Sequence, residues 1–312
     1  MPLLLTDADV ASHLDAATAV GAMRDALVAA YEGRLIAPPR ATAVLEGGRL
    51  VMTAGHLADE WYGFRSYDTF GHNDGEQLVV LHDTRDGRIR AIAVGEEIGS
   101  RRTGALGGAA VDLLALPAAG TVGVIGSGRQ AWSQVWATAA VRPLRSVTVF
   151  SRSAARRTAF AARVRDELGV PATAAGSAAA AVRGCDIVIV ATTSPAPVLR
   201  AADLAPGAHV NVVGFKQQGR AEFGLDLPAR ADVIATDSPS QARSYDPPLL
   251  LAGTVHESSV RDLGAIAAGA VAGRSASSAG FDEITMFLSV GLGGTEVFLL
   301  DRVAALLTAA SS

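Results

Sequence analysis

The stretch from Thr121 to Ala131, TVGVIGSGRQA, constrains the fold of this chain more than any other. It has the pattern of a short apolar strand, a tight glycine turn and the first residues of a helix. Gly126 allows the turn, Gly128 lets the backbone approach a pyrophosphate, and Ala131 lets the helix pack closely on the strand. A second apolar strand, at 146–152, follows at the spacing of a βαβ unit. The stretch therefore predicts a dinucleotide site that includes Gly126, Ser127, Gly128, Arg129, Gln130 and Ala131.

The tip of the second strand indicates which nucleotide is bound. An acidic residue there accepts hydrogen bonds from a ribose 2′-OH, whereas an arginine favours a 2′-phosphate. This chain has Ser151-Arg152-Ser153 at the tip, and the next acidic residue is Asp166. The tip therefore predicts NADP(H) as the cofactor, with Arg152 on the phosphate and Ser151 and Ser153 beside it.

Composition and charge exclude several classes of protein. A length of 312 residues predicts two domains, and 49% hydrophobic residues suffice for a substantial core. The net charge of −4, without a basic run, argues against a nucleic-acid partner. We expect a cytoplasmic protein without a membrane segment, because the N-terminus lacks a signal-peptide pattern and no apolar run approaches the roughly 18 residues of a span. The single Cys185 lies in an apolar run and predicts a core residue, and no Cys/His cluster has metal-ligand spacing.

The periodicity of the chain changes near Thr121. Before it, a helical opening, several short strand-like runs between 41 and 94 and a helix at 97–116 predict an α+β domain. After it, strands and helices alternate, which is typical of a Rossmann-type domain. A last helix is expected from about Asp282 to the C-terminus. We therefore predict an α/β protein with a Rossmann NADP(H)-binding domain at 118–281 and an α+β substrate and dimerisation domain formed by 1–117 and 282–312.

Taken together, these residues resemble the ornithine cyclodeaminase/μ-crystallin family over nearly the whole chain. The resemblance implies a homodimer whose members transfer a hydride between nicotinamide C4 and a carbon bearing nitrogen and a carboxylate. It also adds Thr103, Ala191, Thr192, Thr193, Val213, Gly214 and Gly291 to the expected cofactor-binding residues. The motifs that carry it are Pro39-Arg40, Arg102-Thr103, Gly126-x-Gly-x-Gln-Ala131, Ser151-Arg152, Ala191-Thr-Thr-Ser194, Pro206-Gly-x-His-Val-Asn-Val-Val-Gly214, Glu222, Asp237-Ser238 and Asp282-Glu-Ile-Thr-x-Phe-x-Ser-Val-Gly291.

The resemblance also implies a substrate site. Arg40, Arg65 and Arg102 would surround the substrate carboxylate, and a guanidinium can bind a carboxylate through two parallel hydrogen bonds. Many members have lysine where this chain has Arg65, which leaves open whether Arg65 also serves as a catalytic proton donor. Met52 stands where members often place an apolar substrate contact.

One departure from the family pattern separates its branches. Cyclodeaminases carry an aspartate two residues after the glycine equivalent to Gly214, and this chain has Lys216 there, the only lysine among 27 basic residues. A lysine would repel a cationic diamine such as ornithine. It could instead act as the general acid that protonates an imine nitrogen, or contact a substrate acid without moving protons.

These observations predict an NADPH-dependent reductase of an imine, such as a cyclic ketimine carboxylate, or the reverse amino-acid dehydrogenation. Lys216 and Arg65 are the expected catalytic residues, and Arg40, Met52 and Arg102 the substrate-binding ones. The alternatives are an ornithine cyclodeaminase with tightly bound NAD and a non-catalytic NADPH or small-molecule binder like μ-crystallin.

Overall fold

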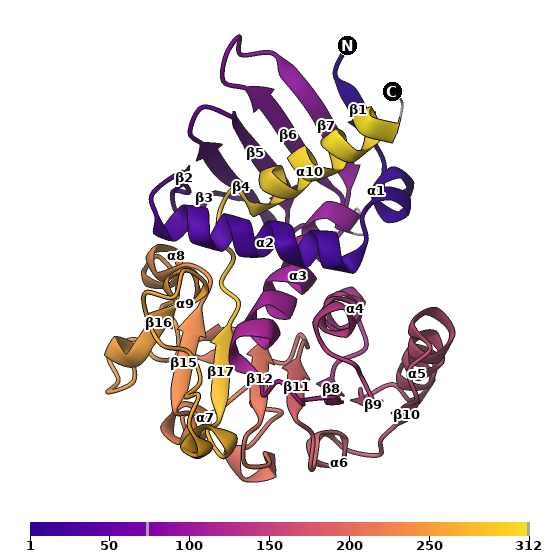
Figure 1. Ribbon diagram of the computed structural model, residues 1–312, viewed down its shortest axis with the longest axis vertical. Helices are drawn as coiled ribbons and strands as arrows, with labels where there is room; N and C mark the ends of the chain where they lie inside the picture. The colour runs from indigo at the N-terminus through magenta and orange to yellow at the C-terminus, as the bar shows by residue number, and fades with distance from the viewer. Residues whose placement is uncertain (73–74, 311–312) are drawn as a thin grey trace. The chain divides into compact units, whose positions relative to one another are not determined.

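The structure, a computed structural model, describes residues 1–72 and 75–310 and divides into two units. Unit 1 contains Met1–Arg102 and Gly291–Ser312, and unit 2 contains Thr103–Val290 (Figure 1). The predicted boundaries lie after residues 117 and 281 instead. The difference arises because α3 (Glu97–Leu114) is one continuous helix, and residues near its C-terminus, such as Val111, belong to the core of unit 2.

Unit 1 is built on a mixed sheet. Its strands follow the order β1-β7-β6-β5-β4-β2, with β3 paired to β4. All pairs are antiparallel except β1 with β7. The strands are β1 (Leu3–Leu5), β2 (Leu35–Ile36), β3 (Ala41–Leu45), β4 (Gly48–Leu57), β5 (Trp61–Asp68), β6 (Gln77–Asp83) and β7 (Ile89–Gly95).

Helices cover one face of this sheet. Figure 1 shows α2 (Ala16–Tyr31) and α10 (Thr295–Ala310) in front of the strands. Helix α1 (Asp7–His13) begins with a capping box in which Thr6 and Asp9 bond each other's backbone amides. Buried residues such as Val79 and Leu81 point to the helices, and alternate residues point to the opposite face.

Unit 2 contains a parallel sheet with the order β10-β9-β8-β11-β12-β17-β15-β16. The chain passes from β8 to β9 and β10 on one side, then returns to β11 on the other side of β8, so the direction of winding reverses between β8 and β11. In open α/β sheets, ligands bind at the carboxyl ends of the strands beside such a reversal. The strands are β8 (Thr121–Ile125), β9 (Ser146–Phe150), β10 (Ala172–Ala174), β11 (Ile187–Val190), β12 (His209–Val212), β15 (Val233–Thr236), β16 (Val260–Asp262) and β17 (Thr285–Leu288).

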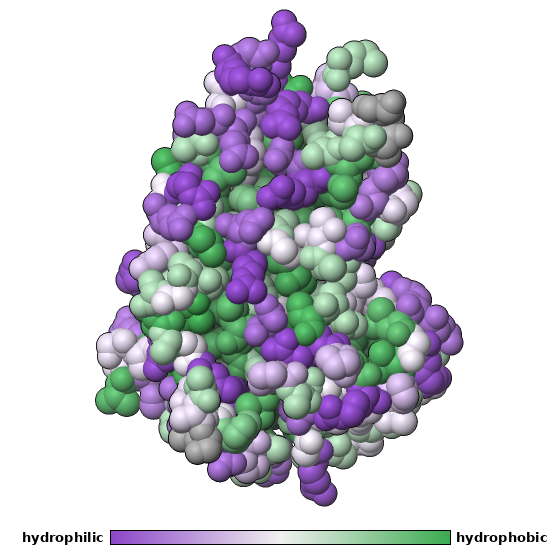
Figure 2. Space-filling model, in the orientation of Figure 1, coloured by the Kyte–Doolittle hydropathy of each residue, from purple (hydrophilic) through white to green (hydrophobic). Residues whose placement is uncertain are grey.

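Helices connect these strands. One of them, α5 (Ala154–Leu168), presents hydrophilic surface at the lower right of Figure 2. A hairpin of β13 (Lys216–Gln217) and β14 (Arg220–Ala221) follows β12. The helices are α4 (Arg129–Val141), α5 (Ala154–Leu168), α6 (Ala178–Val182), α7 (Asp226–Arg230), α8 (Pro239–Arg243) and α9 (Leu263–Ala267), with 3-10 turns η1 (Ala201–Asp203), η2 (Glu257–Ser259) and η3 (Ser278–Phe281). No helix among the described residues is both long and apolar enough to cross a membrane.

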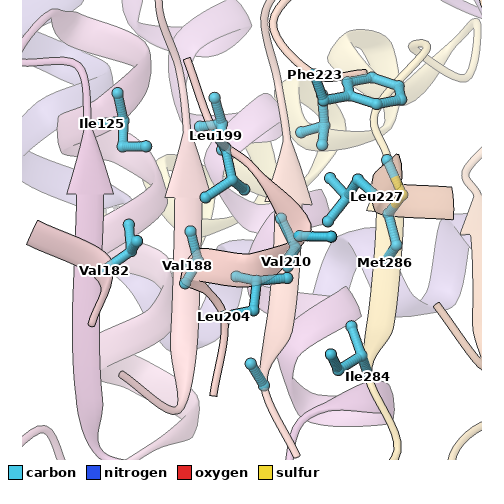
Figure 3. Close-up of a cluster of buried hydrophobic side chains, with 14 of the residues drawn as sticks. Ile125, Val182, Val188, Leu199, Leu204, Val210, Phe223, Leu227, Ile284 and Met286 are labelled. Atoms are coloured by element: carbon cyan, nitrogen blue, oxygen red, sulfur yellow. The ribbon is translucent and has the colours of Figure 1, made fainter. Parts of the chain in front are cut away.

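The parallel sheet is buried on both faces, as the continuous apolar runs of its strands require. Val188 of β11 and Val210 of β12 point to one face, where Figure 3 shows them packed with Leu204 and Leu227. Ile187 belongs to the core on the opposite face. The predicted α/β fold, a Rossmann-type parallel sheet together with a mixed sheet of the N-terminal part, is confirmed.

The predicted helix from about Asp282 onward is wrong in its first part. Thr285–Leu288 form strand β17, which lies in parallel register between β12 and β15, and α10 begins only at Thr295. All four residues of β17 are buried. A short run buried on both faces has no period of two, and periodicity alone does not separate it from a helix.

Arginines that the sequence shows only as abundant have structural roles in unit 2. Arg142 donates to the carbonyl oxygens of Val111, Asp112 and Ala115 at the end of α3. Arg274 donates to the carbonyl oxygen of Leu114 at 2.7 Å. The last carbonyls of a helix lack internal donors, so these two side chains satisfy them.

Candidate functional site

The glycine turn after β8 has the geometry that the sequence predicted. Gly126 has a φ of 121°, which L side chains rarely adopt. A Cβ on Gly126 would also overlap the carbonyl oxygen of Ala191, which follows β11. The Gly126 amide donates to the carbonyl oxygen of Phe150 at 2.8 Å. Both the backbone conformation and the close approach of β11 therefore require glycine here.

The N-terminus of α4 is open. Gly128 is its N-cap and supplies no side-chain hydrogen bond. No described atom lies within 4 Å of the point where a Gly128 Cβ would stand. Ala131 is fully buried and packs α4 on the sheet. Because first-turn amides lack internal acceptors and carry partial positive charge, this end of α4 suits a pyrophosphate.

A cavity of about 600 Å³ lies at this edge of the sheet. Its volume is in the range of small-molecule and cofactor sites. It brings together four segments that the sequence singled out separately: the glycine turn, the tip of β9, the residues after β11 and the end of β12. Its walls include Gly126, Ser127, Gly128, Arg129, Gln130, Ser151, Arg152, Ser153, Arg156, Ala191, Thr192, Thr193, Val213 and Gly214.

The tip of β9 presents arginines to this cavity. Arg152 and Arg156 are exposed and line it, although the sequence analysis assigned a role only to Arg152. Ser153 caps α5 by accepting the Arg156 amide at 3.3 Å, and the Ser151 hydroxyl donates to the Ser153 carbonyl oxygen at 3.1 Å. Arg157 instead donates to the Ser151 carbonyl oxygen at 2.9 Å. The serines thus shape the tip, and two cations remain on the cavity wall.

The cavity residues fit a dinucleotide. The Oε1 atom of Gln130 is buried at the cavity wall and has no hydrogen-bond partner among the described residues. Buried polar atoms are nearly always hydrogen-bonded, so this one calls for a donor from a ligand or water. The open helix N-terminus, this acceptor and the cations at the β9 tip are what a pyrophosphate, its sugars and a ribose phosphate require.

One predicted cofactor residue, Thr103, is not among the residues that line the cavity. Thr103 of α3 is buried, and its carbonyl oxygen accepts the Gln134 side chain at 2.8 Å. Gln134 accepts from the Asn211 amide at 3.0 Å, and Asn211 Oδ1 lies 2.8 Å from His209 Nε2. This arrangement requires a proton on Nε2. Burial lowers the pKa of His209 to about 3, so the ring is neutral and the network ties α3 and α4 to β12.

Lys216 does not line the cavity. It is 4% exposed, and its Nζ donates to the carbonyl oxygens of Val213 at 3.1 Å and Gly214 at 2.5 Å. Glu222, which the sequence marked only as part of the family pattern, is fully buried nearby. Its Oε1 accepts the Thr192 amide at 2.5 Å. Burial raises the pKa of Glu222, and the charge of Lys216 opposes that rise.

In unit 1, three arginines far apart in sequence gather into one group, the arginine cluster of Arg40, Arg65 and Arg102. The guanidiniums of Arg40 and Arg102 both lie within 4 Å of the point where a Gly291 Cβ would stand. Burial lowers the pKa of Arg65, Glu296 raises it, and the charges of Arg102 and Arg40 lower it further. The structure thus brings together the residues predicted to surround a carboxylate.

Glu296 is the acid of this cluster, and sequence reasoning missed it. Its carboxylate is 1% exposed and lies 2.7 Å from both Arg65 Nη1 and Arg102 Nε. Burial alone would raise the pKa of Glu296, but Arg102 and Arg65 more than offset it and hold the pKa below its usual value. Glu296 also lies in the first turn of α10, where the helix favours an anion.

The other contacts of Arg65 hold it still. Its Nε donates to Gln77 Oε1 at 2.7 Å, and its guanidinium stacks 4.0 Å from the centre of the Tyr67 ring. Met52 does not join this group. Thr53, the neighbour of Met52, pairs with Arg65 across β4 and β5 and is buried, so Met52 points to the opposite face and is 43% exposed.

Gly291 lies beside the arginines of unit 1. Its φ is 92°, and its missing Cβ would stand 3.2 Å from Arg40 Nη2. Glycine at this position therefore leaves room for the guanidiniums to converge. Among the described residues, no group of three or more His, Cys, Asp or Glu side chains could hold a metal ion.

Comparison with known proteins shows which proteins this chain is similar to. The family model described as "Ornithine cyclodeaminase/mu-crystallin family" matches residues 1–305. The chain is 31% identical over 226 residues to a Δ1-pyrroline-2-carboxylate reductase of Bacillus cereus, covering 71% of this chain and 68% of that protein. It is 28% identical over 214 residues to the ketimine reductase mu-crystallin of Mus musculus, covering 69% of this chain and 64% of that protein.

The fold matches solved structures over its whole length. The Thermococcus litoralis Δ1-pyrroline-2-carboxylate reductase, solved in complex with NADH and L-proline, superimposes with a TM-score of 0.90 at 25% identity. The match covers 99% of this chain and 98% of that one.

Proposed function

Because the chain belongs to the ornithine cyclodeaminase/μ-crystallin family, we propose that it is an NADPH-dependent reductase of an imine that carries a carboxylate. The observation that carries the proposal is the pair of sites on one chain: a dinucleotide cavity in unit 2 and a buried arginine cluster in unit 1. Two relatives support the proposal, because they are named as reductases of a pyrroline carboxylate and of a ketimine.

The arginine cluster would bind the substrate carboxylate. Arg65 and Arg102 share the single carboxylate of Glu296, which leaves one positive charge in excess on this pair, and an anionic ligand would balance it. Guanidinium groups bind carboxylates in this way. Arg40 reaches the same place through its approach to Gly291.

A reduced nicotinamide supplies the hydride for the imine carbon, and the imine nitrogen takes up a proton. Lys216 and Arg65 are the two expected catalytic residues, and for both the sequence left open whether they donate that proton. Arg65 is a poor donor, because a guanidinium is not deprotonated in proteins. Lys216 would first have to leave the carbonyl oxygens of Val213 and Gly214.

The cofactor preference is a separate part of the proposal. Arg152 and Arg156 line the cavity where a ribose 2′-phosphate would lie, and an arginine there favours NADP(H). The T. litoralis relative was solved with NADH, so both nucleotides must be compared in any assay.

The experiment follows reduced-nicotinamide absorbance with NADPH and NADH separately, against five- and six-membered cyclic ketimine carboxylates. Ornithine with catalytic NAD runs alongside and is scored for ammonia. Oxidation of NADPH by a ketimine is the expected result. Ammonia from ornithine would overturn it in favour of a cyclodeaminase, and tight NADPH binding without turnover across the panel would favour a non-catalytic binder.

We also propose a homodimer that forms through the open face of the sheet in unit 1. One row of paired residues crosses this face of the sheet, from Met52 through Ser66 and Leu78 to Val94. The three apolar side chains of the row, Met52, Leu78 and Val94, are 43%, 37% and 46% exposed. Together with Leu50 they give an apolar surface that suits a partner. Sedimentation should give a dimer for the wild type and a monomer for Leu78→Asp.

Val255→Asp is the matched control for this test, because Val255 is an 86% exposed apolar residue of unit 2. It should leave the mass unchanged. A dimer that survives Leu78→Asp would refute this interface.

A further inference from the structure

The hairpin of β13 and β14, which follows β12, packs against the backbone of the cavity wall. The amide of Glu222, just after β14, donates to the Phe215 carbonyl oxygen at 2.9 Å, and its own carbonyl oxygen accepts the Val198 amide at 2.8 Å. The side chain therefore enters the space between the ends of β11 and β12. These strand ends carry Thr192 and Gly214, which both line the cavity.

Glu222 and Lys216 contact both of these wall segments. Glu222 Oε1 holds the amide of Thr192 after β11, and Oε2 lies against Gly214, where any Cβ would overlap the carboxylate. Lys216 Nζ holds the carbonyl oxygens of Val213 and Gly214 after β12. The backbone of the cavity wall after β11 and β12 is thus held by hydrogen bonds to one buried acid and one buried lysine.

Neither group is suited to burial alone. An ionised carboxylate or ammonium removed from water must be paired or neutralised. Burial raises the pKa of Glu222, and the hydrogen bonds from Thr192 and the charge of Lys216 oppose part of that rise.

The position of this wall gives the pair a functional meaning. The tip of β9 takes the adenosine ribose in this fold and the glycine turn takes the pyrophosphate. The β11 and β12 ends, on the other side of the glycine turn, are left for the nicotinamide half. We propose that Lys216 and Glu222, which hold the same two wall segments, together position this half of the cofactor site, and that Lys216 is a positioning residue rather than the proton donor. The inference rests on the proposed nicotinamide cofactor.

The test compares Lys216→Met, Glu222→Gln and the double variant with the wild type. NADPH affinity is measured by nicotinamide fluorescence, and turnover is measured at saturating NADPH. Each single variant should weaken NADPH binding about tenfold or more, which is about 1.4 kcal/mol, and keep turnover within a few-fold. The double variant should still weaken binding, but by less than the product of the single effects, because it removes both buried charges together. Arg220→Ala, an exposed change on the same hairpin, should alter neither quantity.

Other outcomes overturn the inference. Unchanged NADPH affinity with turnover lowered about a hundredfold or more in Lys216→Met, but not in Glu222→Gln, would make Lys216 a general acid. Unchanged affinity with a lowered Tm would make the pair merely structural. If a single variant fails to fold, the double variant decides, and wild-type affinity in it refutes the inference. The binding measurement needs no imine, so failure of the proposed reductase activity is distinguishable from failure here.

Discussion

Replacing Glu296 by glutamine tests whether one buried carboxylate organises the arginine cluster. The change keeps the size and one acceptor oxygen but removes the charge that Arg65 and Arg102 share at 2.7 Å each. The carboxylate is 1% exposed and the two arginine side chains are 10% and 11% exposed, so water would not replace it. Breaking a buried ion pair costs about 3–5 kcal/mol. Because glutamine keeps a hydrogen-bond acceptor, we expect the lower value, about 3 kcal/mol.

The assay is thermal and urea unfolding with and without a carboxylate ligand. A loss of about 3 kcal/mol should lower Tm by roughly 6–12 °C. A saturating carboxylate should then stabilise Glu296→Gln more than the wild type, because the guanidiniums have lost their internal anion. Glu167→Gln is the control: this 52% exposed partner of Arg163 on α5 should cost about 0.5 kcal/mol or less.

Two results would refute this reasoning. A loss for Glu296→Gln below about 1 kcal/mol would mean that the arginines do not need this counter-charge. Equal stabilisation of variant and wild type by the carboxylate would mean that the ligand does not bind at the arginine cluster.

Three further predictions concern unit 2. Arg152→Ala should weaken NADPH binding about tenfold or more by isothermal titration and leave NADH binding unchanged, and an equal loss for both would contradict the 2′-phosphate assignment. Gly126→Ala should abolish binding of both nucleotides, because the new methyl overlaps the Ala191 carbonyl oxygen, and retained binding would show that the turn can relax. The folded-state pKa of His209 is about 3 against an ordinary 6.5, so its contribution to the free energy of unfolding is complete above pH 6.5. That contribution should fall by about 1.4 kcal/mol per unit as the pH drops from 6.5 towards 3. His209→Gln should flatten this slope in urea titrations, and an unchanged slope would assign the pH dependence to other groups.

The sequence predicted the local parts of the nucleotide site well. The turn at Gly126 and the strand β9 depend on residues close together in the chain, and each carries its own signal. Gly126 illustrates the limit of such a signal. Its positive φ could be expected from the motif, but the Ala191 oxygen that forbids a side chain belongs to the residue after β11, some sixty positions later.

The pairing of strands that lie far apart in the chain could not be predicted from the sequence. Strand β17 pairs with β12 and β15, for example through Thr285 with His209 and Val233. No local pattern encodes these partners. The face on which Met52 lies is set by the register of β4 with β5, which places Thr53 opposite Arg65. A shift of one residue would have moved Met52 to the other face.

The roles of the two buried acids were missed for the same reason, although Glu222 was named as part of the family pattern. Glu296 and Glu222 look like ordinary charged residues in the sequence, because their cationic partners come from other elements. Arg65 and Arg102 were identified through a family resemblance, yet nothing in that resemblance named the acid that holds them. A buried arginine or lysine expected at a site therefore implies an acid to be sought in three dimensions.

The contacts of Lys216 give a physical reason why this one position is lysine in a chain with 26 arginines. Its Nζ donates to the carbonyl oxygens of two consecutive residues, Val213 and Gly214. The Lys216 residue is only 4% exposed, and Glu222 lies nearby. A compact ammonium with three rotatable donors can meet acceptors so close together. A guanidinium spreads its donors over a rigid planar fork that needs more room. Lys216→Arg keeps the charge but not this geometry, so it should weaken NADPH binding as Lys216→Met does, whereas a lysine needed only for its charge would tolerate the exchange.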